Sequence, residues 1–215
     1  MNLTLRPATP PDIPACARLA HAALSPSPLI QAIAPTSEAH ALAFWSAVAQ
    51  SGVDEPNSHL IVVVEDTTPH APPGVVGFAK WVYVPAGAPA PGILAAGAGG
   101  EGEGAGLGEM VGDAELAGRF FSEQNVRHEK YMAGRRHWYL ELICTRPEVK
   151  GLGAGRRLVQ WGVERVDGDG CEAYLEASPE GRGLFERFGF VVVERLGYLD
   201  GRYVECSMVR GMKGE

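Results

Sequence analysis

The chain has 215 residues, of which 46% are hydrophobic and 21% are charged, and its formal net charge is −7. This composition is ordinary for a globular protein and supplies enough chain for one sizeable core. The acidic balance argues against a nucleic-acid partner, because nucleic-acid-binding proteins normally carry a basic face. It mildly favours a cationic partner.

The cysteines and the apolar runs bear on compartment and partners. Cys16, Cys144, Cys171 and Cys206 are far apart and form no CxxC pair and no Cys/His cluster, so we expect reduced thiols and no metal site. No charged-then-apolar leader opens the sequence, and no apolar run is long enough to span a membrane. We therefore expect a soluble cytoplasmic protein without a membrane partner, either a monomer or a homodimer.

The N-terminal segment predicts a strand at residues 3–6 and then a helix. Asp12 is a residue type that caps helices, and the apolar residues after it recur at helical spacing. Two prolines, Pro26 and Pro28, are expected to end this helix. Its predicted apolar face comprises Ile13, Cys16, Ala20 and Leu24.

A second helix and a pair of strands come next. The helix is expected from residue 37 to about 50, with Gly52 ending it. Residues 60–64 form a continuous apolar run, which predicts a strand buried on both faces. After a proline-rich turn at 67–74, residues 75–83 are predicted to form its antiparallel hairpin partner.

Residues 85–112 are almost all Gly, Ala and Pro, with Glu101, Glu103 and Glu109 as their charges. Such a segment cannot bury enough apolar surface to offset the entropy lost on ordering, so we expect a flexible or disordered insertion. The alternative for a loop of this length is a functional one, here a lid over a binding site.

The following segment, residues 113–132, is predicted to be helical. Its expected apolar face carries Leu116, Phe120, Val126 and Tyr131. Glu123 and Arg127 are spaced i,i+4 and are expected on the solvent side.

The central stretch, residues 138–190, predicts a strand–turn–helix–strand unit. An apolar strand at 138–145 leads into a glycine-rich run at 150–157, a helix at about 156–166 and a second strand at 173–177. The amides at a helix N-terminus and the helix dipole both favour an anion. Lys150, Arg156 and Arg157 add positive charge there, so we interpret the turn as a diphosphate site.

Two familiar phosphate-binding loops do not fit this turn. A Walker loop needs Gly-Lys-Ser/Thr, which is absent, and the dinucleotide fingerprint needs a third glycine where Leu158 stands. What remains is a basic residue, two spacers, Gly-x-Gly and an amphipathic helix.

The C-terminal residues predict a strand pair. Residues 191–194 and 203–209 form the strands, and 196–202 a glycine-containing turn. In the last strand Val204, Cys206 and Met208 are expected to face the core, with Glu205 and Ser207 facing out.

Lys150-x-x-Gly153-x-Gly155 resembles the Arg/Gln-x-x-Gly-x-Gly/Ala signature of the GNAT superfamily of acyl-CoA-dependent N-acyltransferases. The strand and proline turn at 140–147 are similar to the acetyl-CoA strand of that family, and residues 175–178 and the Gly-Phe pair at 189–190 also match. Lysine departs from Arg/Gln at the first signature position but keeps a donor.

The resemblance implies an α/β (α+β) fold, with a mixed, mostly antiparallel central sheet flanked by helices and an acetyl-CoA strand that splays from its neighbour. It implies one domain over residues 1–215, with the segment at about 85–112 as an insertion. Acetyl-CoA is then the expected co-substrate, without a metal. The residues expected to bind it are Ile143, Cys144, Thr145, Lys150, Gly151, Leu152, Gly153, Ala154, Gly155, Arg156 and Ser178.

Acyl transfer to an amine needs a route for the amine proton and donors for the oxyanion. GNAT enzymes often carry a glutamate early in this strand, and Glu141 is the matching residue, which we expect to act as general base. If the strand is regular, Glu141 shares a face with Tyr139 and Ile143, and burial would raise its pKa. The alternative is a solvent-facing glutamate. The expected oxyanion donor is a backbone N–H near Ile143 or Cys144.

One position departs from the family pattern. Phe185 stands where many members have a tyrosine that protonates the leaving thiolate. The thiolate could leave unassisted, or Tyr174, Ser178 or Tyr198 could replace that tyrosine, so the acid stays unassigned. A covalent route through Cys144 and His137 is disfavoured, since direct transfer is what the resemblance implies.

The predicted function is direct acetyl transfer from acetyl-CoA to an amine in a ternary complex, with a small cationic molecule as the acceptor. The alternatives are a non-catalytic acyl-CoA-binding or regulatory module, which the missing tyrosine suggests, and a scaffold whose glycine turn binds nothing.

Overall fold

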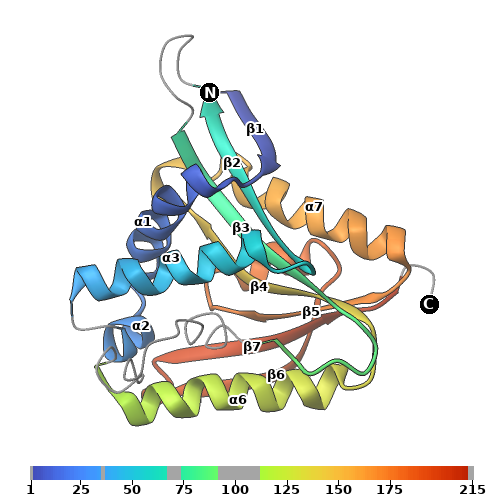
Figure 1. Cartoon of the computed structure of the whole chain (residues 1–215). Helices are drawn as coiled ribbons and strands as arrows, with labels where there is room; N and C mark the ends of the chain where they lie inside the picture. The colour runs from blue at the N-terminus through green and yellow to red at the C-terminus, as the bar shows by residue number, and fades with distance from the viewer. Residues whose placement is uncertain (1, 35–36, 67–73, 92–111, 213–215) are drawn as a thin grey trace.

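Seven β-strands form one mixed sheet in the computed structural model, which describes residues 2–34, 37–66, 74–91 and 112–212 (Figure 1). The strand order is β1-β2-β3-β4-β5-β7-β6. Neighbouring strands are antiparallel except β4 and β5, which are parallel. The strands are β1 (Asn2–Pro7), β2 (Ser58–Asp66), β3 (Gly74–Val84), β4 (His137–Thr145), β5 (Glu172–Ala177), β6 (Val191–Tyr198) and β7 (Tyr203–Arg210).

Helices cover both faces of this sheet (Figure 1). One face carries α7 (Ala154–Asp169) and α8 (Arg182–Glu186), whose apolar residues join those of the sheet in one core cluster. On the other face α1 (Ile13–Leu24) and α3 (Glu38–Asp54) cover β2, β3 and β4, while α2 (Pro28–Ile33) and α6 (Ala114–Met132) cover the half with β5, β6 and β7. Two short 3₁₀ helices, η1 (Pro10–Asp12) and η2 (Pro147–Val149), precede α1 and α7.

The first predicted strand, the first two long helices and the 60–83 hairpin are confirmed, but three local signals act differently from expectation. Asp12 does not cap α1. It accepts the backbone N–H of Thr9 (2.8 Å) and pairs with Arg6, which closes the preceding 3₁₀ turn. Pro28 begins α2 and does not merely end α1, because proline suits the first helical position.

Gly52 lies inside α3 and does not end it. The helix continues to Asp54, and a Cβ at position 52 would come within 3.1 Å of the Leu60 Cβ. The glycine therefore allows α3 to approach β2 closely.

The face of α6 was predicted correctly only in part: Phe120 is buried and Leu116 and Tyr131 pack against the core as expected, but Val126 and Arg127 do not follow the prediction. Val126 is 66% exposed, whereas Arg127 and His128 are buried. The same error affects β7, where Glu205 and Ser207 are buried beneath α6. Both errors have one cause: polar side chains of α6 and β7 bond to one another inside the protein, so polarity does not mark the solvent side here.

The C-terminal turn is shorter than predicted. Strand β6 continues to Tyr198, and the turn itself holds Leu199 and Asp200 at positive φ (54° and 56°). Residues 67–73 of the predicted turn and most of the predicted insertion at 85–112 lie outside the described residues, and Gly74, the last residue of that turn, is instead the first residue of β3.

Candidate functional site

Strands β4 and β5 run side by side for only four residues each. His137 to Leu140 pair with Glu172 to Leu175, and the pairing ends there. The later part of β4 continues to pair with β3 on its other edge. The predicted splay of the strand at 138–145 is therefore present, and its open side faces β5.

The backbone of β4 presents alternate amides to this open side. The Arg146 N–H donates to the Val76 carbonyl (2.9 Å), which fixes the phase of the antiparallel hydrogen bonds between β3 and β4. Cys144 then points its amide toward β3, while Ile143 and Thr145 point theirs away from it. Of the two amides predicted as oxyanion donors, the Ile143 N–H faces the open side of β4 and the Cys144 N–H faces β3.

The turn after β4 offers a cluster of free amides. Gly151 and Gly153 adopt φ of 85° and 88°, which glycine reaches without strain. Among the described residues, no acceptor bonds the amides of Gly151 and Gly153 or those of the first turn of α7, Ala154, Gly155 and Arg156. These five N–H groups surround a helix N-terminus, which is the arrangement that binds phosphate.

The same turn has room for a ligand. A Cβ built on Gly151 or Gly153 would meet no atom within 4 Å. Gly155 is different, because a Cβ there would lie 3.4 Å from Leu184, so this glycine also brings α7 close to α8.

Other predicted residues of this turn contribute less. Lys150 and Leu152 already donate their amides to Pro147 and Val149 (3.1 and 3.0 Å), so only the exposed Lys150 side chain remains for an anion. Ala154 is buried and can offer only its amide. Arg157 was expected to add charge to the site, but its guanidinium donates to the Leu3 carbonyl at 2.8 Å.

The predicted base, Glu141, lies at a β-bulge. Trp81 and Lys80 oppose Leu140 and Leu142, which leaves Glu141 without an opposite residue. The bulge reverses the alternation of β4, so Ile143 packs in the α7-side core while Leu142 packs on the opposite face with α1 and α3. The expected common face of Glu141 and Ile143 is therefore absent, because the strand is not regular.

The Glu141 carboxylate is held in a buried ion pair. Its Oε2 lies 2.7 Å from the Lys80 Nζ, and the two side chains are 1% and 2% exposed. Lys80 also donates to the Ser51 hydroxyl of α3 (2.7 Å). Burial raises the pKa of Glu141, and Lys80 opposes that shift. The base role stays a prediction, and Lys80 is the observation that weakens it.

The remaining sequence candidates lie around β5 and α8. Ser178 follows β5, and its hydroxyl oxygen accepts the Gly181 N–H at 3.2 Å. Phe185 is buried and packs against Phe190, so it supplies no proton donor. Burial raises the pKa of Cys144 well above its usual value, which disfavours a thiolate nucleophile there.

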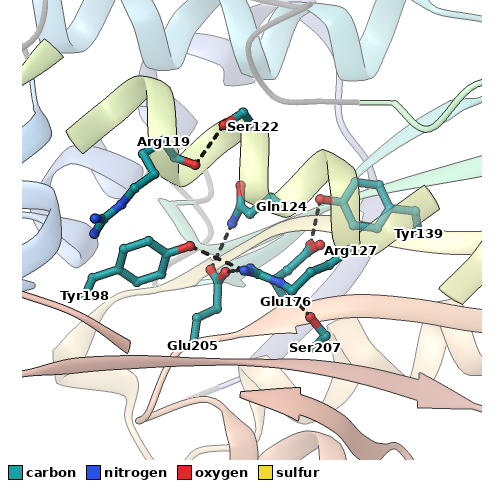
Figure 2. Close-up of polar contacts among 9 residues, drawn as sticks. All are labelled: Arg119, Ser122, Gln124, Arg127, Tyr139, Glu176, Tyr198, Glu205 and Ser207. Carbon is teal, nitrogen blue, oxygen red and sulfur yellow. Dashed lines mark hydrogen bonds and ion pairs between the residues drawn. The ribbon is translucent and has the colours of Figure 1, made fainter. Parts of the chain in front are cut away.

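A buried polar network that the sequence analysis missed lies between α6 and the sheet (Figure 2). Arg127 forms an ion pair with Glu205 and donates to Ser207 (3.0 Å) and Tyr198 (3.3 Å). Beside it, the Tyr139 hydroxyl donates to Glu176 (2.9 Å). The signal in the sequence was the i,i+2 repeat of Glu205 and Ser207, which was interpreted as a solvent face.

An open pocket of about 340 Å³ lies away from the glycine turn. It is lined by Asn57, His59, Tyr83, Arg136, Trp138 and Asp169. Trp138 belongs to the first residues of β4, whereas the glycine turn follows its last residue. The pocket is thus at the opposite end of that strand and contributes nothing to the free amides.

The described part of the chain contains no cluster of three or more His, Cys, Asp or Glu side chains arranged to hold a metal ion. In the same residues, no helix combines the length and apolar character needed to cross a membrane.

Comparison with known structures finds the same fold in several acetyltransferases. A protein from Corynebacterium glutamicum described as histone acetyltransferase HPA2 and related acetyltransferase has a TM-score of 0.63 and 20% identity, covering 100% of this chain and 99% of that one. Arabidopsis thaliana NAA60 in complex with acetyl-CoA has a TM-score of 0.59 and 14% identity, covering 99% and 100%. A GNAT acetyltransferase from Brucella melitensis, also with acetyl-CoA, has a TM-score of 0.50 and 16% identity, covering 95% and 86%.

These identities are low enough that the structural likeness establishes the fold alone. The sequence itself matches the model of the acetyltransferase (GNAT) family over residues 29–190. That match includes the splayed strand, the bulge and the glycine turn described above. The chain therefore belongs to the acetyltransferase (GNAT) family.

Proposed function

We propose that this protein transfers the acetyl group of acetyl-CoA directly to an amine in a ternary complex, with a small cationic molecule as the acceptor. The observation that carries the proposal is the set of five free amides at the glycine turn, next to the strand that has parted from β5. Acetyl-CoA bound to NAA60 and to the Brucella protein, which share this fold, supports the choice of co-substrate.

The proposed seat for the diphosphate uses the amides of Gly151, Gly153, Ala154, Gly155 and Arg156, with the Lys150 side chain as the nearby cation. Main-chain donors suit this task because they are fixed before the anion arrives.

The pantetheine arm would lie along the open side of β4, where it can pair with the backbone as an added strand does. Ile143 and Thr145 present their amides and carbonyls to that side. In this arrangement the Ile143 N–H is the donor for the thioester oxygen as negative charge develops, an interaction commonly worth about 3 kcal/mol. Ser178, which follows β5 on the other side of the opening, can donate its hydroxyl hydrogen to the cofactor.

The acceptor is proposed to be cationic because the whole chain carries a net charge of −7. Long-range attraction raises the encounter rate of a cation with an acidic protein. Direct transfer is favoured over a covalent acetyl-cysteine because Cys144 is buried and its pKa is raised.

Release of free coenzyme A thiol, measured across a panel of monoamines, polyamines, aminoglycosides and lysine-containing peptides, tests this function. We expect turnover with at least one small polycationic amine and intersecting initial-velocity lines, as a ternary complex requires. Parallel lines would contradict direct transfer.

A second candidate function is an acyl-CoA-binding or regulatory module without catalysis. The favouring observation is Phe185, which is buried where a hydroxyl donor would be needed. Binding of acetyl-CoA without thiol release for any member of the panel would support this alternative.

A further inference from the structure

Glu176 is the first residue of β5 beyond the last β4–β5 pair, which joins Leu140 to Leu175. Leu175 and Ala177 pack in the core beneath α7, so the side chain between them lies on the opposite face. There the Tyr139 hydroxyl of β4 donates to Glu176 Oε2 at 2.9 Å, across the point where the strands part (Figure 2). The carboxyl group is thus fixed at the mouth of the splay.

The other oxygen, Oε1, is buried and has no hydrogen-bond partner among the described residues. The Tyr174 hydroxyl lies close on the same face and lowers the pKa of this carboxyl, but the two groups form no well-aligned hydrogen bond. A buried carboxyl oxygen without a donor favours a bound proton or an incoming donor. An amine N–H can provide either.

The charged groups around Glu176 do not neutralise it. Arg127 is directed to Glu205 and Ser207, and Figure 2 shows the guanidinium turned toward that pair. Burial, followed by the charge of Glu205, raises the pKa of Glu176 to about 8, while Tyr139 and Arg127 lower it. The titratable groups that act on the carboxyl are Arg127 of α6, Tyr139 of β4, Tyr174 of β5 and Glu205 of β7, and His128 of α6 lies against the rings of the two tyrosines.

Glu141, the other carboxyl near the splay on this face, is in the opposite situation. To accept a proton it would have to release Lys80, which is itself buried. A proton on Glu141 would leave the buried Lys80 ammonium without its counter-charge, and this cost opposes protonation of Glu141. Protonation of Glu176 leaves no counter-charge behind.

We propose that Glu176, positioned by Tyr139, accepts the proton that the acceptor amine loses during acetyl transfer, an inference that rests on the proposed function. The amine nitrogen attacks the thioester carbonyl carbon, so that a C–N bond forms and the C–S bond breaks. The N–H proton passes to Glu176 Oε1, directly or through one water. The coenzyme A thiolate takes its proton from solvent.

The test is the pH dependence of kcat at saturating acetyl-CoA and acceptor, which reports groups in the enzyme–substrate complex. The wild-type rate should rise with pH through about 8, following Glu176. In Glu176→Gln the rate at pH 8 should fall at least 100-fold, because base catalysis is commonly worth 10²–10⁴-fold. The rising part of the pH profile, called the limb below, should vanish in this variant. Acetyl-CoA affinity, measured by calorimetry, should stay within about twofold.

A second variant keeps the inference testable if Glu176→Gln folds poorly. Tyr139→Phe removes a donor that stabilises the carboxylate, so the limb should move to higher pH by about one unit. Glu141→Gln should leave the limb in place. Glu172→Gln is the matched control from the same strand: its carboxylate pairs with Arg135 near the surface, and its rate should stay within about twofold of wild type.

The outcomes separate this inference from the proposed function. Wild-type turnover with an unchanged limb in both Glu176→Gln and Tyr139→Phe overturns the inference alone. A limb that disappears in Glu141→Gln and persists in Glu176→Gln also overturns it and returns the base role to Glu141. Acetyl-CoA binding without turnover on any amine overturns both.

Discussion

Two histidines, His128 of α6 and His137 of β4, meet inside the protein with their Nε2 atoms 2.7 Å apart. The Nδ1 of His137 lies 2.9 Å from the Arg135 carbonyl, so it carries the hydrogen and leaves Nε2 as an acceptor. His128 must then donate from Nε2. Both rings are neutral in this arrangement, because a second proton on His137 would face the Nε2–H of His128, and a second proton on His128 would lie on its Nδ1, which is buried without a partner among the described residues.

This pair predicts a loss of stability in acid. Burial, and then His137, lowers the pKa of His128 to about 3, and burial also lowers the pKa of His137. Between pH 6.5 and about 3 the unfolded chain binds a proton at position 128 and the folded protein does not, so the free energy of unfolding decreases as the pH is lowered. From pH 6.5 to 5 this one group should remove about 2 kcal/mol.

Urea unfolding of wild type and His128→Phe at pH 7 and pH 5 checks this loss. The variant should lose less stability between the two pH values, since it has one fewer group to protonate. An identical loss in both proteins would show that His128 is protonated in the folded state.

At the residue scale, the sequence identified Glu141 as a candidate base but did not show which group, if any, neutralises each carboxylate. Glu141 was found through a motif, while Glu176, in residues 175–178 of the same comparison, received no role. Their difference depends on Lys80 and Tyr139, which approach from other strands. Such cross-strand partners follow from strand order and register, which local sequence does not specify.

Contact between α7 and β3 depends on a glycine within the helix. A Cβ on Gly162 would lie 2.1 Å from the ring of Trp81, which is fully buried. The indole N–H of Trp81 also donates to the Leu158 carbonyl of α7 (3.3 Å). Helix α7, which carries the proposed diphosphate site, thus packs against the sheet through this tryptophan.

Gly162→Ala should destabilise the protein, although alanine is the better helix former. Displacing the indole from a well-packed core should cost about 1–3 kcal/mol in the free energy of unfolding. The matched control is Gly168→Ala in the same helix, where a Cβ would meet no atom within 4 Å and no loss is expected. Guanidinium unfolding decides, and equal stability of the two variants would refute the packing argument.

At the element scale, the sequence predicted most helices and strands but not the rotation of α6 or the bulge in β4. The apolar spacing of α6 placed Val126 inside, and the buried Arg127 and His128 displaced it. Tertiary pairing decided that orientation, as it did for Glu205 and Ser207. The bulge at Glu141 inserts one residue without any glycine or proline to mark it.

At the scale of the whole molecule, the order of elements in the central stretch was predictable from the sequence, and the parting of two parallel strands was predictable because the motif resembles a family in which that strand splays. The strand, the glycine turn and the helix are consecutive in the chain, so residues 138–169 define the centre of the sheet locally. The layer formed by α2 and α6 was not predictable. Short α2 begins at a proline that was interpreted as a stop, and α6 covers strands that come later in the chain.

The central claim is that the free amides of the glycine turn bind the diphosphate of acetyl-CoA. Gly153 is the residue to change. Valine is strained at its φ of 88°, and the valine side chain would fill the open space that an approaching phosphate needs. Gly168→Val, at the exposed far end of α7, is the matched control. S-acetylpantetheine, which lacks the nucleotide and its diphosphate, is the matched ligand.

Titration calorimetry of the three proteins with both ligands is the most direct test. We predict that Gly153→Val binds acetyl-CoA at least tenfold more weakly than wild type, that Gly168→Val binds it equally well, and that the weaker binding of S-acetylpantetheine is the same in all three. Equal acetyl-CoA affinity in wild type and a folded Gly153→Val would contradict a diphosphate site at this turn.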